Sequence, residues 1–138
     1  MKNLFIFLIS IFILLISCNK EKKVSNNDIL KQVEFMKKST EYCNKAIKVI
    51  DSDTSLTITQ NQMNEHIEFL KKAVYEAKKV DTSVLNKIKN GFGEIYTKKY
   101  IEGIEQQIKG YESVNSSLAI KGQILYDEYI DWKVKEGL

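Results

Sequence analysis

Proline is absent from this 138-residue chain, and glycine and cysteine are scarce, with six and two residues. A proline in a helix interior costs about 3 kcal/mol, so a chain without proline can form long helices. The 21 basic and 18 acidic residues give a formal net charge of only +3. Because the lysines are scattered among glutamate and aspartate, the sequence does not support nucleic-acid binding. At this length one domain is expected.

Histidine is scarcer still, with His66 as the only one in the chain. A single histidine excludes most catalytic and metal-binding arrangements that depend on this residue. A di-iron bundle needs Glu-x-x-His on two helices, and a covalently attached haem needs Cys-x-x-Cys-His. Gly91 and Gly93 follow no strand and lack the third glycine of a nucleotide-binding loop. Because His66 adjoins Glu65 near the polar face of a predicted helix, we expect a surface histidine. We predict no catalytic residue, no metal and no cofactor.

The N-terminus carries an apolar segment typical of export signals. Lys2 is followed, from Leu4 to Ile16, by thirteen residues that are apolar apart from Ser10. A transmembrane helix needs about 20 apolar residues, so this segment is short for a span. Its length is that of the apolar region of a signal peptide, and the small Ser17 follows where such signals are cleaved.

The segment ends in Leu15-Ile16-Ser17-Cys18, and the residues after it are polar. These four residues resemble the bacterial lipoprotein signal, which has leucine three residues before a cysteine and a small residue directly before it. The resemblance covers residues 1–18 only. It implies that residues 1–17 are removed, that the Cys18 thiol receives a diacylglyceryl group, and that the new amine is acylated. Two or more acyl chains anchor a protein stably to a membrane. The alternative is an uncleaved anchor helix in which Cys18 has no role.

The same resemblance implies a location in the cell membrane, exported and held by lipid. Asn19 follows the cysteine where an aspartate would resemble an inner-membrane retention signal, so the outer membrane is favoured if the source has two membranes. Residues 18–27 would comprise the lipidated cysteine and a polar tether with a reach of roughly 30 Å. Three tether lysines either favour an anionic membrane surface by about 1 kcal/mol each or only solvate the tether. They are Lys20, Lys22 and Lys23.

Residues 28–138 are predicted to form an all-α domain, because apolar or small residues recur at alternating spacings of four and three. The first seam comprises Ile29, Val33, Met36, Thr40, Cys43, Ile47 and Ile50. The second comprises Met63, Ile67, Leu70, Val74 and Ala77. The last comprises Leu118, Gly122, Leu125, Tyr129 and Trp132. A second row widens the apolar face of this last helix and comprises Ile120, Ile124, Ile130 and Val134.

Cys43 lies on the first seam, so we predict a small buried core residue rather than a reactive thiol. With Cys18 lipidated, Cys43 has no cysteine partner, and the core must be held together by packing. The helices should begin at polar caps. Thr59 with Gln62 fits a capping box, and Ser116 or Ser117 can cap the last helix.

The third helical stretch is less regular than the others. Its apolar residues form two sets that are out of phase, Leu85, Ile88, Phe92 and Ile95, then Ile101, Ile104, Ile108 and Tyr111. Because Gly91 and Gly93 lie in the first set, we predict a helix that is kinked or broken near residues 90–100. Gly110 offers a possible end for it. The predicted fold is an all-α, up-down-up-down four-helix bundle with short loops.

Tyrosine and tryptophan are concentrated in the last third of the chain, interleaved with lysine, as is typical of interfaces. The seam spacing of Tyr129 and Trp132 indicates core positions, with the other tyrosines half-exposed around them. A more functional interpretation is that some of these residues are accessible and bind a partner. The candidates are Tyr96, Lys99, Tyr100 and Tyr126.

With no catalytic constellation, the sequence favours a non-enzymatic, lipid-anchored binding module. Its expected partners are the membrane, through Cys18, and an unidentified protein or another envelope component. The rival hypothesis is a carrier that holds a small apolar ligand or lipid between its helices. An apolar cavity of about 300 Å³ or more opening between Gly91 and Tyr100 would favour the carrier. A flat exposed patch around Tyr96 and Tyr100 would favour the binding module.

Overall fold

The protein is all-helical over the part of the chain that the computed structural model describes, residues 24–51 and 57–138. The elements are α2 (Asn26–Asp51), α3 (Gln60–Ala77), α4 (Thr82–Ile88), α5 (Phe92–Ile95), the π-helix η1 (Tyr96–Ile101), α6 (Glu102–Glu112) and α7 (Ser116–Glu136). No strand occurs in these two ranges, and the all-α prediction is confirmed. Cys18 and the tether lysines lie outside the described residues, so the predictions about them stay predictions.

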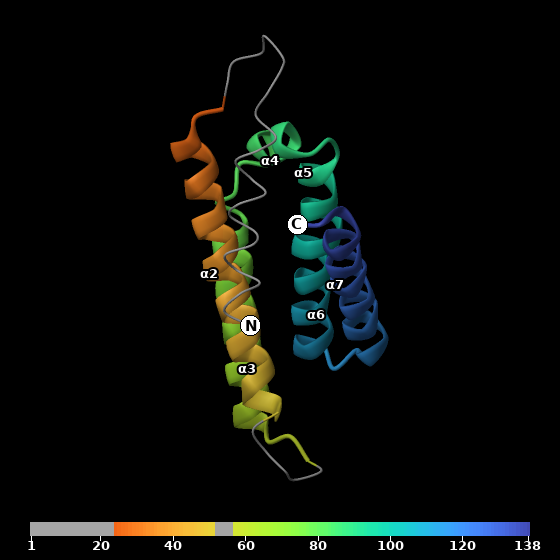
Figure 1. The fold of residues 1–138 in the computed structure, drawn as a ribbon. Coiled ribbons are helices and arrows are strands. Elements are labelled where there is room, and N and C mark those ends of the chain that lie inside the picture. Colours follow the sequence, from red (N-terminus) through yellow and green to blue (C-terminus); the bar gives the residue numbers. More distant parts are fainter. Residues whose placement is uncertain (1–23, 52–56) are drawn as a thin grey trace.

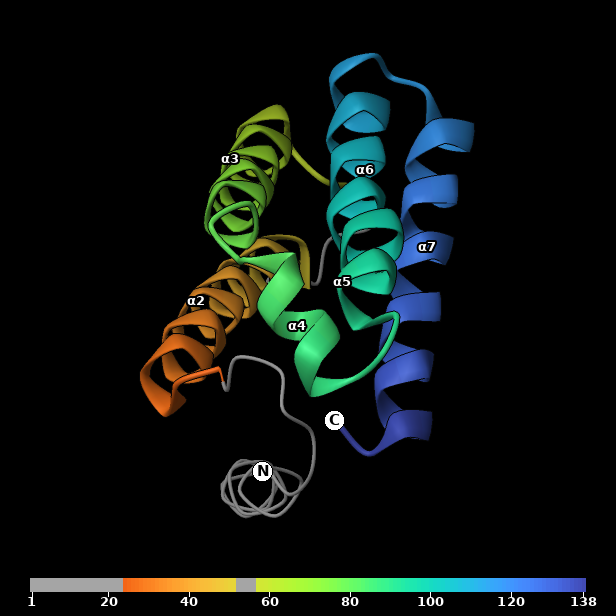
Figure 2. The ribbon, with the colours of Figure 1, turned by 90° about the horizontal axis from the view of Figure 1, so that it is seen from above.

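The longer helices are arranged as two side-by-side pairs. α2 packs along α3, α6 packs along α7, and contacts between α3 and α6 join the pairs (Figure 1). Seen from above, the α2–α3 pair lies beside the α6–α7 pair, and α4 leads from one pair to the other (Figure 2). The main hydrophobic cluster takes residues from α2, α3, η1, α6 and α7, so the core lies where the two pairs meet.

Small residues bring α2 and α3 close together. Ser39 and Ala46 of α2 and Ala73 of α3 are fully buried, and the Ser39 hydroxyl donates to the Ala73 carbonyl oxygen at 2.8 Å. Two members of the predicted α2 seam, Thr40 and Ile47, are exposed instead. The seam prediction followed apolar character, whereas a close helix contact selects residues with small side chains.

Side-chain caps fix where the helices start. The predicted capping box is confirmed, because the Gln62 N–H donates to Thr59 Oγ1 at 3.3 Å and the Thr59 N–H donates to Gln62 Oε1 at 2.8 Å. The cap of α7 is Asn115, whose side-chain oxygen accepts from the Leu118 N–H at 3.1 Å. The prediction that one of the two following serines caps this helix is wrong, because both serines already belong to its first turn.

A π-helical turn explains the irregular third stretch. α4 ends at Ile88, and α5 begins after Gly91, whose φ of 79° lies in the left-handed region that favours glycine. From there α5, η1 and α6 follow one another directly. Every fourth residue of this stretch is buried, namely Phe92, Tyr96, Tyr100, Ile104 and Ile108. A four-residue repeat drifts around an α-helix of 3.6 residues per turn, and the wider π-helical turn returns it to the same face.

Glycines bring α6 and α7 into backbone contact. A Cβ atom on Gly122 would lie 2.5 Å from the Gly103 carbonyl oxygen and 2.5 Å from the Gln107 nitrogen. A Cβ atom on Gly110 would lie 2.3 Å from the Ala119 nitrogen. Gly110 is therefore a packing position inside α6, which continues beyond it, and the predicted helix end there is wrong.

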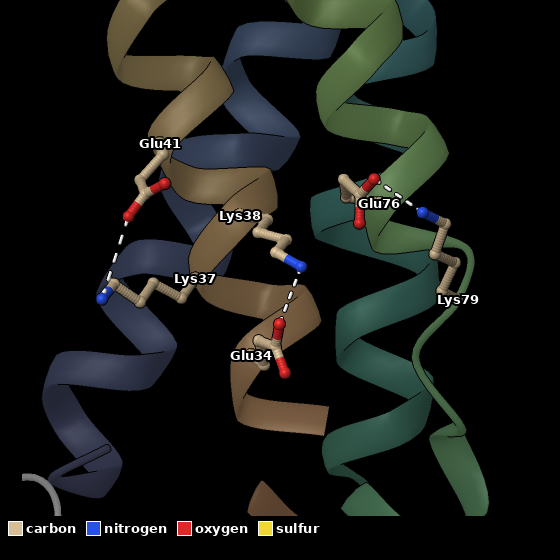
Figure 3. A network of polar contacts seen from close by, with 6 residues as sticks. All are labelled: Glu34, Lys37, Lys38, Glu41, Glu76 and Lys79. Carbon is tan, nitrogen blue, oxygen red and sulfur yellow. Dashed lines mark hydrogen bonds and ion pairs between the residues drawn. The ribbon is translucent and has the colours of Figure 1, made fainter. Parts of the chain in front are cut away.

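Ion pairs lie on α2, where they are exposed, and at the end of α3, where the Glu76 side chain is only 13% exposed. Those drawn in Figure 3 are Lys37–Glu41 at 4.0 Å, Lys38–Glu34 at 2.7 Å and Lys79–Glu76 at 2.6 Å. Pairs on a protein surface typically contribute about 0–1 kcal/mol, because water screens the charges and ordering the side chains costs entropy. The α2 pairs are solvated, and the buried contacts determine the fold.

Candidate functional site

The predicted partner-binding residues lie in or against the core. Tyr96 and Tyr100 are only 1% and 2% exposed, so the expectation that they are accessible is wrong. Tyr126 is half-buried against Tyr100, with ring centroids 5.6 Å apart, and Lys99 is half-buried and pairs with Glu128 of α7. The cause is the π-helical turn, which brings both tyrosines of η1 onto its buried face.

Four tyrosines pack around one buried polar centre. They are Tyr96, Tyr100, Tyr126 and Tyr129, and the centroids of contacting rings are 4.9 to 5.9 Å apart. The Tyr100 hydroxyl donates to Ser39 Oγ at 2.8 Å, because the Ser39 proton goes to the Ala73 carbonyl oxygen. Cys43 Sγ lies 3.6 Å from the same hydroxyl, and the buried Tyr96 hydroxyl has no hydrogen-bond partner within the described ranges. Burial raises the pKa of all four tyrosine hydroxyls.

Cys43 is buried, as predicted. Loss of contact with water raises the pKa of its thiol to about 11. The thiolate is the reactive form of cysteine, and reactive cysteines have a lowered pKa. Cys43 is therefore a packing residue beside the tyrosines.

His66 is a core residue, and the expectation of a surface histidine is wrong. It is 3% exposed, and its Nδ1 lies 2.8 Å from the Ala46 carbonyl oxygen, which can only accept, so Nδ1 carries the proton. The ring meets Tyr111 edge-on at 5.1 Å, and Nε2 has no hydrogen-bond partner in the described part of the chain. Because both α2 and α6 cover α3, its buried face includes a second row that contains His66. No group of acidic, histidine or cysteine side chains in residues 24–51 and 57–138 could hold a metal ion.

An apolar groove of about 840 Å³ lies where α3 begins and where α6 connects to α7. Ile67, Gly110 and Ala119 are its buried lining residues, and the exposed Ile58 and Ile120 stand at its edge. Its lining includes no residue between Gly91 and Tyr100, so this hollow lies away from the entrance predicted for a ligand carrier.

Charged side chains cross one side of this groove. Lys71 lies 3.2 Å from Glu68 and 3.0 Å from Glu112, and all three residues line the groove. One lysine therefore faces two glutamates, which leaves this edge with one net negative charge.

Val114, also in the groove lining, has a strained backbone and an exposed side chain. Its φ is 52°, in the left-handed region that a β-branched residue rarely adopts, and 93% of the residue is exposed. Such a conformation costs of the order of 1–3 kcal/mol, and strained residues of this kind cluster at binding sites. The position combines an apolar side chain, full exposure and strain at the edge of an apolar groove.

An exposed apolar row runs along α7 from this groove. The row predicted to widen the core face is exposed at every position, so that prediction is wrong. Among the described elements, α6 and η1 make the main contacts with α7, and both cover its opposite side. Asp127 and Asp131 lie on the same face and are exposed. We call this face the α7 surface, and it comprises Ile120, Ile124, Asp127, Ile130, Asp131 and Val134. The aspartates between the isoleucines were the sequence signal that this row faces water.

Comparison of the chain with models of known protein families, with curated proteins and with solved structures gave no match. Within the described ranges, no helix is both long enough and apolar enough to cross a membrane. The groove and the exposed α7 surface are the features of the described residues that point to a function.

Proposed function

We propose that the protein is a non-enzymatic binding module, anchored by lipid at Cys18 to the membrane of a bacterial cell envelope. It binds a protein or another envelope component through a helix face. The observation that carries this proposal is the apolar groove continuing into the exposed row of α7, because contiguous exposed apolar patches mark interaction sites. The surface around Tyr96 and Tyr100 is not part of the proposal, since those residues are buried.

The distance between the anchor and the binding surface suits this role. Val24 is six residues after Cys18, so the first described residue is within about 20 Å of the lipid. α2 has 26 residues and is therefore about 39 Å long. The groove lies where α3 begins, at the end of the molecule opposite the start of α2 (Figure 1). α2 would hold the groove away from the membrane, and the outer membrane is favoured where there are two.

We extend the proposal to the arrangement of the helices. α2, α3, the combined stretch α5–η1–α6, and α7 follow an up-down-up-down course, with the third helix kinked near residues 90–100. Contacts between consecutive helices support this course. Distances between spin labels at the ends of α2, α3 and α7 would test it, and parallel neighbours would contradict it.

The anchor and the binding face can be tested separately. Cys18→Ser should leave an uncleaved precursor without a lipid label, and normal processing of this variant would contradict the anchor. Affinity capture from envelope extract would then use the full chain and Ile124→Lys, with Leu30→Lys as the control, because Leu30 is an exposed apolar residue on α2. A component retained by the control and lost with Ile124→Lys is expected. Equal capture by both variants would refute the face chosen here.

A carrier of a small apolar ligand or lipid is the second candidate. The groove exceeds the roughly 300 Å³ at which ligand pockets begin, and Met63, Ile67 and Tyr111 are among its apolar lining. Ile120 lines the groove whereas Ile124 does not. Binding of a fluorescent fatty acid that is lost with Ile120→Lys and kept with Ile124→Lys would favour the carrier.

A further inference from the structure

We propose that the partner of the α7 surface is a basic amphipathic helix. It lies along α7, sets its lysine or arginine side chains against Asp127 and Asp131, and inserts an apolar side chain into the groove beside Ile120. This inference rests on the proposed function and specifies the chemistry of the partner.

The α7 surface has the shape of a helix-binding face. At 3.6 residues per turn, its six residues fall within roughly a third of the helix circumference, and Ile120 to Val134 spans about 21 Å. The two aspartates lie between the apolar residues rather than beside them. Because Ile120 also lines the groove, the surface is continuous with it. Partner helices bind such faces through residues spaced three or four apart, which here would meet the isoleucines in turn.

The charge of this surface is negative, although the chain as a whole carries +3. Asp127 accepts a hydrogen bond from Gln123 at 2.8 Å, and within the described part of the chain no lysine forms an ion pair with Asp127 or Asp131. Lys133 cannot neutralise them, because it is half-buried with its ammonium 5.8 Å from the centre of the Tyr129 ring. The groove edge adds one further net negative charge, so a cationic partner is favoured from the groove to Asp131, whereas the exposed Lys135 marks the positive end of α7.

The same charges disfavour two other occupants. A second copy of α7 could pack antiparallel with its centre at Asp127. Ile120 of one copy would then face Val134 of the other, and Ile124 would face Ile130. That pairing also sets Asp127 against Asp127 of the other copy, with Asp131 beside them, and like charges in contact suppress association. An anionic membrane surface is repelled for the same reason.

Two matched peptides test the proposal. Each has about 18 residues, five helical turns, with leucine on one face and either lysine or glutamate at all other positions. Fluorescence anisotropy would measure their binding to the lipidated full chain in phosphatidylcholine nanodiscs, with empty nanodiscs subtracted. The lysine peptide should bind about tenfold more tightly, and the difference should shrink as salt screens the charges.

Charge reversal on α7 provides the specific control. Asp127→Lys combined with Asp131→Lys should reverse the preference in favour of the glutamate peptide. Glu65→Lys combined with Glu34→Lys changes the net charge equally on exposed sites away from the α7 surface and should keep the original preference. A loss of preference in this control pair would show a response to overall charge and would overturn the proposal.

The remaining outcomes separate this inference from the function on which it rests. Equal binding of both peptides, binding of neither, or dimerisation of the chain in sedimentation would each overturn the basic helix. A photo-crosslinking residue at position 124, in the full chain in its own envelope, tests the binding module itself. A protein adduct, together with equal binding of the two peptides or binding of neither, supports the binding module and refutes the basic helix. No adduct and no peptide binding would refute both.

Discussion

Gly122→Ala should destabilise the protein, although alanine is the better helix former. In an exposed helix this change would stabilise by about 1 kcal/mol. Here the new Cβ atom would lie 2.5 Å from the Gly103 carbonyl oxygen and from the Gln107 nitrogen. Both are backbone atoms of α6, so neither can rotate away, and the two helices must separate. Overpacking of this kind typically costs about 1–3 kcal/mol.

The cost should lie at the upper end of that range, because separation also loosens the contact of Gly110 with Ala119 further along the same helix pair. Subtracting the gain in helix propensity leaves a destabilisation of about 1–2 kcal/mol. For a domain of this size the melting temperature should fall by roughly 4–8 °C.

Thermal and urea unfolding, followed by circular dichroism, would measure this change. Lys121→Ala is the control, because Lys121 is the exposed neighbour of Gly122 in α7 and its replacement should change the free energy of unfolding by less than about 0.5 kcal/mol. An increase in stability with Gly122→Ala would refute the backbone contact between α6 and α7.

Three further predictions concern the tyrosine cluster. Tyr100→Phe removes the hydroxyl that donates to Ser39 and should lower the free energy of unfolding, measured in urea, by about 1–3 kcal/mol. Tyr96→Phe removes a hydroxyl that has no hydrogen-bond partner among the described residues and should not lower it, so equal losses would contradict this assignment. Burial raises the pKa of these tyrosines above the unfolded value of 10.0, so the stability that they contribute is present below pH 10 and lost above it. In a variant with phenylalanine at the three tyrosines outside the cluster, Tyr42, Tyr75 and Tyr111, tyrosinate absorbance should appear only as the helices unfold in alkali, and ionisation with the helices intact would refute this. Cys43, with a thiol pKa of about 11, should react with a thiol reagent in urea but not in the native protein, and rapid native labelling would show that it is accessible.

Local features of the helices could be predicted from the sequence. The seam of α3 and the Thr59 capping box depend on residues three or four positions apart, which interact within one turn. The buried position of Cys43 followed from the same periodicity. These interactions do not depend on which other helix lies nearby.

The errors arose where burial depends on neighbours that the sequence does not specify. His66 is buried because two helices cover α3, whereas Ile120 and Ile124 are exposed because only one side of α7 is covered. Tyr96 and Tyr100 are buried because a π-helical turn changes the phase of their helix. The repeat of large residues at every fourth position could have revealed this turn, since an α-helix does not keep such a repeat on one face.

The pairing of consecutive helices has a consequence for how the chain folds. α2 packs against α3, the next helix in the sequence, and α6 packs against α7, so most of the packing joins segments close together in the chain. Domains dominated by such local contacts fold within microseconds to milliseconds, because little loop entropy is lost before contacts form. If the chain crosses a membrane unfolded, as its proposed signal implies, each helical hairpin can form as soon as its second helix emerges. Fast local folding would limit the time during which the apolar faces are open to aggregation beside the membrane.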